Sequence, residues 1–556
     1  HTVEYQMRDI YTAGWSAGRY IKGIGNIITE YRVHVFVDGQ GNTYERPIEN
    51  INLGFKREQC GNMKGEPINI GTGNSFQEET DLSFSDVGSP LTFKRAYNSR
   101  STYSGPIGFG WTHNYDVNLT ETDTLHIEIK RGDGGVSLFI KSPEETYQDL
   151  SSQSTCIEEL IVDELRTGWH WHRRDGSAYK FNAEGRLEKI ISNGNETVLT
   201  YNVNDCLETV TDVGSGRGFQ FVYNDQGLLT QIYGPVTAAV PSGIWASYGY
   251  DTNQNLISVT YADGSGFDYG YTDLNDVHNL TGKQDKMNHT LSSWTYDDQD
   301  RAIENVTRDG RGVSIQYVGH NIAEVTDTYG STRTYRLSTL KGYQMFKNVE
   351  GESSCPHCGS NEVRREYDNE LRLIEIEYAN GLINQYDDFD SQGNAQTARQ
   401  AVGTPYEKTI TRTFHPELNL ELTLSTISVI GNGNNLIIWD YDDDSNDTPN
   451  ENPTQLLHRK IESGFTKDIS GNIVPYEYIT AYTYNDKGQI LTIDGPKAGN
   501  QDKLIFSYDT ATGDLLTETR PLIGATSYSD YDDSPQIIAL PNPSGNRPSY
   551  TRYGPR

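Results

Sequence analysis

A short pattern of apolar and polar positions recurs along most of the chain. It consists of Tyr, then Asp or Asn, a few polar residues, Gly or Asn, and then Leu or Ile at the start of an alternating segment. Clear copies begin at Tyr201, Tyr223, Tyr250, Tyr296, Tyr367, Tyr484 and Tyr508. Alternation with a period of two is typical of a half-buried β-strand. A unit of about 22 residues predicts roughly 16 stacked repeats, with two strands each, between residues 166 and 520.

Each part of the unit has a physical role. We expect Tyr to close a strand, with its ring on the sheet and its hydroxyl reaching water or a neighbour. Asp or Asn then caps the turn, and Gly takes the left-handed backbone position of a hairpin. One such hairpin is at best marginally stable in water, so the units must pair edge to edge as one sheet. We therefore predict an all-β fold, a spiralling antiparallel sheet that twists into a partial or whole hollow shell.

Composition agrees with this prediction and excludes several functional classes. The chain has 37 Tyr and 54 Gly but only 35% hydrophobic residues, which suits a thin sheet with alternate apolar positions. Its net charge of −31 repels a phosphate backbone, so we expect no nucleic-acid partner. No apolar run approaches the roughly 20 residues of a transmembrane helix. Five Cys is an odd and sparse number, which argues against a disulfide scaffold.

Segments before and within the repeats resemble the RHS/YD-repeat family of bacterial toxin systems, which is related to the shell of teneurins. The matching segments are GEPINIGTGN (65–74), FKRAYNS (93–99), GFGWTHNY (108–115) and residues 175–190, together with the Tyr-Asp or Tyr-Asn units. The resemblance implies a β-sheet that spirals into a hollow shell. It also implies a distinct C-terminal closing module and a variable toxin domain released by self-cleavage.

Four regions are predicted. Residues 1–64 form a β-rich segment, with a strand at 31–37, that caps the first sheet edge or pairs with another subunit. Residues 65–165 form the pre-repeat module of the RHS family, 166–520 the repeat array, and 521–556 a Pro/Gly/Tyr-rich tail. The acidic stretch 440–453 interrupts the repeats and predicts an exposed loop.

Cys355, His357 and Cys358 make the sharpest local motif. Two Cys in a tight turn followed by Gly match one half of a zinc ribbon. Three interpretations remain open, namely a local disulfide or inert loop, a metal site completed by distant residues, and a redox site. We expect no cofactor, with zinc or calcium as the alternatives.

Weaker candidates favour structural interpretations. Ser16 lies in a Gly-x-Ser-x-Gly pattern, but the flanking residues fit an ordinary turn better than a nucleophile elbow. His170 and His172 alternate with two Trp and share one strand face, where they form a polar surface or hold a metal.

Two further motifs concern ion binding. Asp442, Asp444 and Asn446 imitate part of a calcium loop but lack its Gly and bidentate Glu. Residues 71–74 lack the Lys of a phosphate loop, so they predict a turn.

These observations favour a non-enzymatic extracellular structural protein that self-assembles into a filament or surface layer. One alternative is a toxin-delivery shell whose cargo is absent from this chain, and another is a hydrolase. We expect self-association, or another component of an RHS system as the partner. The chain begins with His1 rather than Met, so an upstream segment, for example a secretion signal, has been removed or lies outside this sequence. We expect a location outside the cell or on its surface.

Overall fold

The computed structural model describes residues 50–54, 61–84, 91–142 and 145–527, together with the backbone of four strands between residues 3 and 46. Within 145–527 the description has gaps at 150–154, 164, 193–194, 237–239, 352–361, 417, 432, 443–448, 451–453, 455, 486–487, 509–514 and 522–523. In the described residues the only helix is the 3₁₀ turn η1 (Asn50–Asn52), and nearly all other regular structure is β-strand. The predicted all-β class is confirmed.

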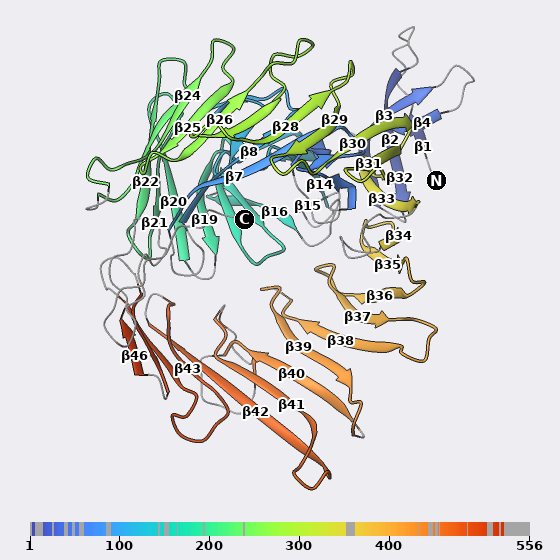
Figure 1. Cartoon of the computed structure of the whole chain (residues 1–556), viewed down its shortest axis with the longest axis vertical. Helices are drawn as coiled ribbons and strands as arrows, with labels where there is room; N and C mark the ends of the chain where they lie inside the picture. The colour runs from blue at the N-terminus through green and yellow to red at the C-terminus, as the bar shows by residue number, and fades with distance from the viewer. Residues whose placement is uncertain are drawn as a thin grey trace.

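One sheet of 35 strands, β12 to β46, dominates the molecule (Figure 1). Each strand pairs with the next one in the sequence, so the predicted antiparallel sheet of stacked hairpins is confirmed. Its first strands are β12 (Asn118–Asp123), β13 (His126–Lys130), β14 (Val136–Lys141), β15 (Tyr147–Asp149), β16 (Cys156–Val162), β17 (Leu165–His172), β18 (Ala178–Asn182), β19 (Leu187–Ser192), β20 (Asn195–Tyr201), β21 (Leu207–Asp212), β22 (Gly218–Tyr223) and β23 (Leu229–Tyr233). The next are β24 (Ile244–Tyr250), β25 (Leu256–Tyr261), β26 (Gly266–Gly270), β27 (Gly282–Asp285), β28 (Thr290–Tyr296), β29 (Ala302–Thr307), β30 (Gly312–Gly319), β31 (Ile322–Asp327), β32 (Thr332–Leu340) and β33 (Tyr343–Glu350). The last are β34 (Glu362–Tyr367), β35 (Leu373–Tyr378), β36 (Ile383–Phe389), β37 (Ala395–Gln400), β38 (Lys408–Phe414), β39 (Glu421–Ile427), β40 (Asn434–Asp440), β41 (Arg459–Lys467), β42 (Ile473–Tyr484), β43 (Ile490–Asp494), β44 (Leu504–Tyr508), β45 (Leu515–Arg520) and β46 (Gly524–Ser527).

Three small sheets accompany the large one. The first contains β5 (Met63–Lys64), β6 (Ile68–Asn69), β7 (Asn74–Phe84), β8 (Leu91–Asn98) and β11 (Trp111–His113), in the order β11-β8-β7-β6-β5. The second pairs β9 (Ser104–Gly105) with β10 (Gly108–Phe109). The third joins β1 (Val3–Tyr5), β2 (Trp15–Ile24), β3 (Ile27–Val37) and β4 (Thr43–Arg46) in sequence order. The strand predicted at 31–37 is therefore present within β3.

The repeat unit has the predicted local structure. Tyr250 closes β24, and the Oδ1 atom of Asp251 accepts hydrogen bonds from the backbone N–H groups of Asn253 and Asn255, at 2.8 Å each. The left-handed position belongs to Gly227 in one unit, with φ of 77°, as predicted. In the unit of Asp251 it belongs to Gln254, with φ of 65°, so the Asp caps a turn that has no Gly.

The Tyr hydroxyls join consecutive repeats. The Tyr250 hydroxyl donates a 2.7 Å hydrogen bond to the carbonyl of Leu229, the first residue of β23. The same bond runs from Tyr201 to Leu187, Tyr223 to Leu207, Tyr296 to Leu280, Tyr317 to Ala302, Tyr484 to Leu457 and Tyr508 to Ile490. Each of these Tyr residues thus bonds to the backbone at or just before the start of an earlier strand, which identifies the neighbour that the sequence left open.

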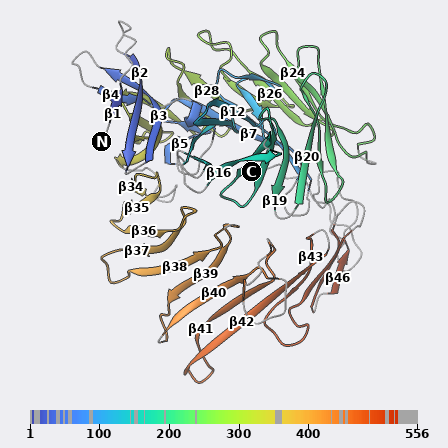
Figure 2. The same ribbon diagram turned by 180° about the vertical axis from the view of Figure 1, so that it is seen from behind.

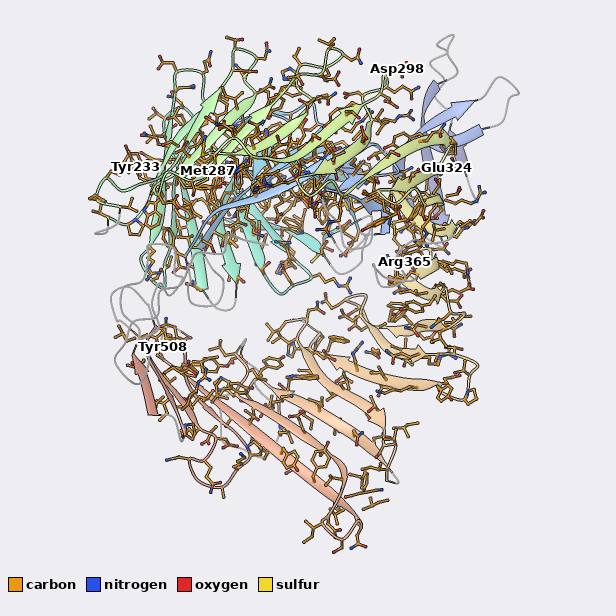
Figure 3. The ribbon with its side chains drawn as sticks, viewed as in Figure 1. Tyr233, Met287, Asp298, Glu324, Arg365 and Tyr508 are labelled. Carbon is orange, nitrogen blue, oxygen red and sulfur yellow. The ribbon has the colours of Figure 1, made fainter. Side chains whose placement is uncertain are left out.

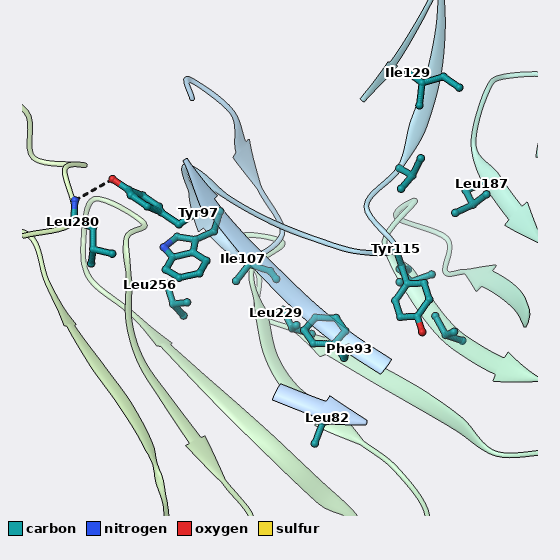
Figure 4. Close-up of a cluster of buried hydrophobic side chains, with 14 of the residues drawn as sticks. Leu82, Phe93, Tyr97, Ile107, Tyr115, Ile129, Leu187, Leu229, Leu256 and Leu280 are labelled. Carbon is teal, nitrogen blue, oxygen red and sulfur yellow. Dashed lines mark hydrogen bonds between the residues drawn. The ribbon is translucent and has the colours of Figure 1, made fainter. Parts of the chain in front are cut away.

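The first half of the large sheet wraps around the β5–β8 and β11 sheet. Buried apolar side chains from Ile68 to Val349 form one continuous core. Figure 4 shows part of it, where Tyr97 of β8 reaches the large sheet and its hydroxyl accepts a 2.9 Å hydrogen bond from the N–H of Leu280. We call this region, residues 61–351, the packed half.

The second half of the sheet is a single layer. Within the described residues after 351, the buried apolar side chains are Leu371, Ile376, Ala398 and Ile410. Side chains stand on both sides of the ribbon between the labelled Arg365 and Tyr508 (Figure 3). We call strands β34 to β46 the single-layer half. Figures 1 and 2 show these yellow-to-red strands as a curved sheet that continues from the packed half and bends beneath it.

Candidate functional site

A set of hydrogen bonds holds the single-layer half beneath the packed half. The Nη2 atom of Arg174, in the turn between β17 and β18, donates 3.1 Å hydrogen bonds to the carbonyl of Gly393 and to Oδ1 of Asn394. The side-chain amide of Asn419 in turn donates to the carbonyl of Arg174. We call these three hydrogen bonds the Arg174 contact.

The Arg174 contact joins residues that are far apart in the sequence. It brings the turn between β17 and β18 against the turns that follow β36 and β38, 219 to 245 residues further on. Gly176 is required there, because its φ is +77° and a Cβ would lie 2.8 Å from the carbonyl oxygen of Leu418. The sheet therefore returns to its own earlier strands, as a spiral does.

Charge pairs across neighbouring strands supplement the backbone ladder of the single-layer half. Arg364 of β34 lies between Glu375 and Glu377 of β35, and its Nε is 2.9 Å from Glu377 Oε2. Hydrogen bonds from Gln385 and Arg364 lower the pKa of Glu375. Because half-exposed ion pairs stabilise a protein only weakly, we expect this half to be held chiefly by its backbone hydrogen bonds and by its edges.

One acidic residue of this half departs from its prediction. The region 440–453 was expected to be an exposed loop, but Asp440 lies at the end of β40 with its side chain fully buried. Its carboxylate is 2.6 Å from Arg459 Nη2, so the cross-strand partner explains the burial. Asp442 is also buried. Asp444 and Asn446, the other members of the calcium-like pattern, lie outside the described residues.

A buried ion pair anchors the packed half. Arg95 of β8 and Asp81 of β7 have no exposed side-chain surface, and their Nε and Oδ2 atoms are 2.8 Å apart. Tyr248 and Tyr261 donate to the two oxygens of Asp81, at 2.8 and 2.7 Å. Burial opposes the charge of Arg95, but the neighbouring Asp81, Tyr269, Tyr261 and Glu79 together outweigh it and keep the pKa of Arg95 raised. This cluster connects the inner sheet to β24 and β25.

A pocket of about 600 Å³ lies between residues 103–120 and the turns of the repeats. The residues that line it include Tyr103, Asp116, Arg186, Tyr201 and Tyr223. Burial would raise the pKa of Asp116, but the ammonium of Lys130, 2.6 Å away, keeps it below its usual value. The carboxylate therefore stays ionised near neutral pH. It suits an ion pair rather than a general acid.

The structure places the other candidate residues as follows. Cys355, His357 and Cys358 lie outside the described residues, so their disulfide, metal and redox interpretations stay predictions. Ser16 lies within the backbone of strand β2, not in the expected turn. Residues 71–73 form the expected turn before β7, where the Gly73 N–H donates to the carbonyl of Asn69 at 2.7 Å.

His170 and His172 share one strand face, as predicted, and Glu158 joins them from β16. Sequence reasoning missed Glu158 because the pairing register of β16 and β17 decides which residue lies opposite His170. The signal that was available is the alternation of polar and apolar residues in the preceding strand, where Cys156 and Glu158 flank the apolar Ile157.

Comparisons with known proteins agree with the repeat architecture. Residues 65–139 match a family described as a domain of unknown function, DUF6531. Three curated relatives are RhsB of Dickeya dadantii (strain 3937), 24% identical over 347 residues, the double-stranded DNA deaminase toxin A of Burkholderia cenocepacia (strain H111), 26% over 309 residues, and the tRNA nuclease WapA of Bacillus subtilis (strain 168), 24% over 312 residues. The matches cover 50%, 50% and 47% of this chain but 23%, 20% and 13% of the relatives. This chain thus spans less than a quarter of each of them.

Among solved structures, TcdB2-TccC3 without its hypervariable C-terminal region aligns with 96% of this chain and 30% of its own, at a TM-score of 0.44 and 10% identity. The part of the chain that the structure describes contains no helix with the length and apolar character of a membrane span. The relatives, the Tyr-Asp units and the sheet that they build together confirm the resemblance to the RHS/YD-repeat family.

Proposed function

We propose that this chain is part of the wall of a toxin-delivery shell, a container that holds a toxic polypeptide. The observation that carries the proposal is the Arg174 contact, which brings the single-layer half back to the turn between β17 and β18 of the same sheet. A single layer has two accessible faces, and a curved sheet can therefore present one of them to an enclosed chain. The relatives named as toxins support this reading over a self-assembling structural subunit.

We further propose that the chain itself has no catalytic activity and that the toxic activity belongs to the enclosed polypeptide. The buried carboxylate of the pocket, Asp116, supports this, because its ion pair with Lys130 keeps it ionised and favours a structural role over proton donation. The protein acts outside the cell or on its surface, and its partner is another component of the toxin system.

A protection experiment tests the proposal. A protease-sensitive reporter polypeptide is joined after Arg556 of the full chain, and its digestion is compared with that of the same reporter joined to an unrelated soluble protein. The proposal predicts slower digestion in the chain and faster digestion when Arg174→Ala removes the two side-chain hydrogen bonds of the contact. Equal rates in the chain and in the unrelated protein would contradict it.

A further inference from the structure

Three metal-binding side chains meet on the outer side of strands β16 and β17. Trp169 and Trp171 of β17 are buried in the core, so the alternating His170 and His172 point to the opposite face of the sheet. Glu158 of β16 lies directly opposite His170 in the pairing register. One ligand atom from each of Glu158, His170 and His172 lies within 4.8 Å of the other two.

The distances show that these side chains already converge. The imidazole rings of His170 and His172 have centroids 4.0 Å apart, and His172 Nε2 is 3.2 Å from Glu158 Oε2. The Nε2 atom of His170 is buried and has no hydrogen-bond partner in the described residues. A buried ring nitrogen without a partner costs free energy, and a bound cation would satisfy it.

Charged side chains on both neighbouring strands lie opposite His170. Lys180 lies opposite His170 on β18 and opposes a cation, whereas the carboxylate of Glu158 attracts one.

We propose that Glu158, His170 and His172 form a binding site for a divalent transition-metal ion, with zinc as the best fit. Two imidazole nitrogens and one carboxylate oxygen are a ligand set that zinc accepts in tetrahedral geometry, with water in the fourth position. Cys156 lies opposite His172 on the same face but does not belong to the group whose ligand atoms converge. The proposed site therefore has three protein ligands.

The position of the site gives the metal a structural consequence. His172 ends β17 and lies two residues before Arg174, which belongs to the turn that follows this strand. The site also joins β16 to β17. An ion that binds only the folded chain stabilises it by mass action. Bound zinc is expected to stiffen the strand pair from which the Arg174 contact projects.

Zinc titration of the full chain tests the site. The starting protein carries Cys355→Ser and Cys358→Ser, so that the predicted Cys knuckle contributes nothing. Binding is measured at pH 7 by competition with a chromophoric zinc chelator. We expect His170→Ala and Glu158→Gln each to weaken zinc binding about tenfold or more. Loss of a residue that only hydrogen-bonds to a metal ligand already has an effect of that size. Circular dichroism confirms that each variant is folded.

His289→Ala is the matched control, since His289 pairs with Asp285 at 2.8 Å but belongs to no three-donor group in the described residues. This variant should bind zinc as the starting protein does. Unchanged zinc affinity in Glu158→Gln, whose exposed side chain makes it the variant least prone to misfold, would overturn the proposal. So would loss of affinity in Cys156→Ser equal to that in His170→Ala, because the three-ligand set would then be wrong.

Discussion

The hydroxyl of Tyr223, at the end of β22, donates a 2.8 Å hydrogen bond to the backbone carbonyl of Leu207, the first residue of β21. This bond spans one repeat, and it recurs along both halves of the sheet. It explains why Tyr, and not simply an aromatic residue, begins the repeated pattern. The ring covers the sheet while the hydroxyl satisfies a carbonyl at the start of the preceding strand.

Tyr223→Phe should therefore loosen one repeat without changing its packing. The carbonyl of Leu207 loses its partner, which is expected to cost about 1 kcal/mol of local stability. Hydrogen exchange of the β21 and β22 amides measures this change. Tyr406→Phe is the control, because Tyr406 is 84% exposed, and it should leave exchange unaltered. Equal exchange in the two variants would mean that the hydroxyl plays no part in the repeat.

The Arg174 contact is expected to limit the mobility of the single-layer half. Arg174→Ala removes hydrogen bonds from a charged donor, each worth about 1.5 to 3 kcal/mol. Amides around Gly393 and Asn419 should then exchange at least about tenfold faster, since 1.4 kcal/mol corresponds to a factor of ten. Arg311→Ala is the control, because Arg311 is exposed and pairs only with the nearby Asp309 among the contacts described. No difference between these variants would argue against a spiral closed at this point.

The buried pair of Asp81 and Arg95 should be important for stability. Arg95→Met leaves the carboxylate of Asp81 buried without its cation, which is expected to destabilise the packed half by about 3 to 5 kcal/mol. Denaturant unfolding, followed by tryptophan fluorescence, measures the change. The adjacent Lys94→Met removes a half-exposed pair with Glu78 and should cost less than about 1 kcal/mol. Similar losses in the two variants would contradict the anchoring role of Arg95.

Acid should weaken the packed half through His113. Burial lowers the pKa of this side chain from 6.5 to about 4. Below pH 6.5 the unfolded chain binds a proton that the folded chain does not, so stability falls as the pH drops from 6.5 to 4 and is unaffected above that window. The loss amounts to about 3 kcal/mol, from 1.36 kcal/mol per pKa unit. His113→Phe should flatten this part of the profile, and an unchanged slope would contradict the assignment.

The local features of the fold could be predicted from the sequence, and the long-range ones could not. The Tyr, Asx and Leu positions of each hairpin depend on neighbours within a few residues, so their pattern is visible in the chain. The partners of Asp81, by contrast, are Tyr248 and Tyr261, which lie 167 and 180 residues further along. The position of Glu158 opposite His170 depends on the pairing register of β16 and β17. Burial of Asp440 depends on Arg459 in the next strand, so this first residue of the region expected to be an exposed loop is buried instead.

One chain forms a curved wall whose single-layer half bends beneath its packed half. Electron microscopy of the purified full chain would show this arrangement. We expect separate particles of one chain each, with a thin curved layer beneath a denser lobe. Arg174→Ala should increase the separation of the two parts. Filaments that lengthen with protein concentration would contradict the account and restore the self-assembling structural subunit.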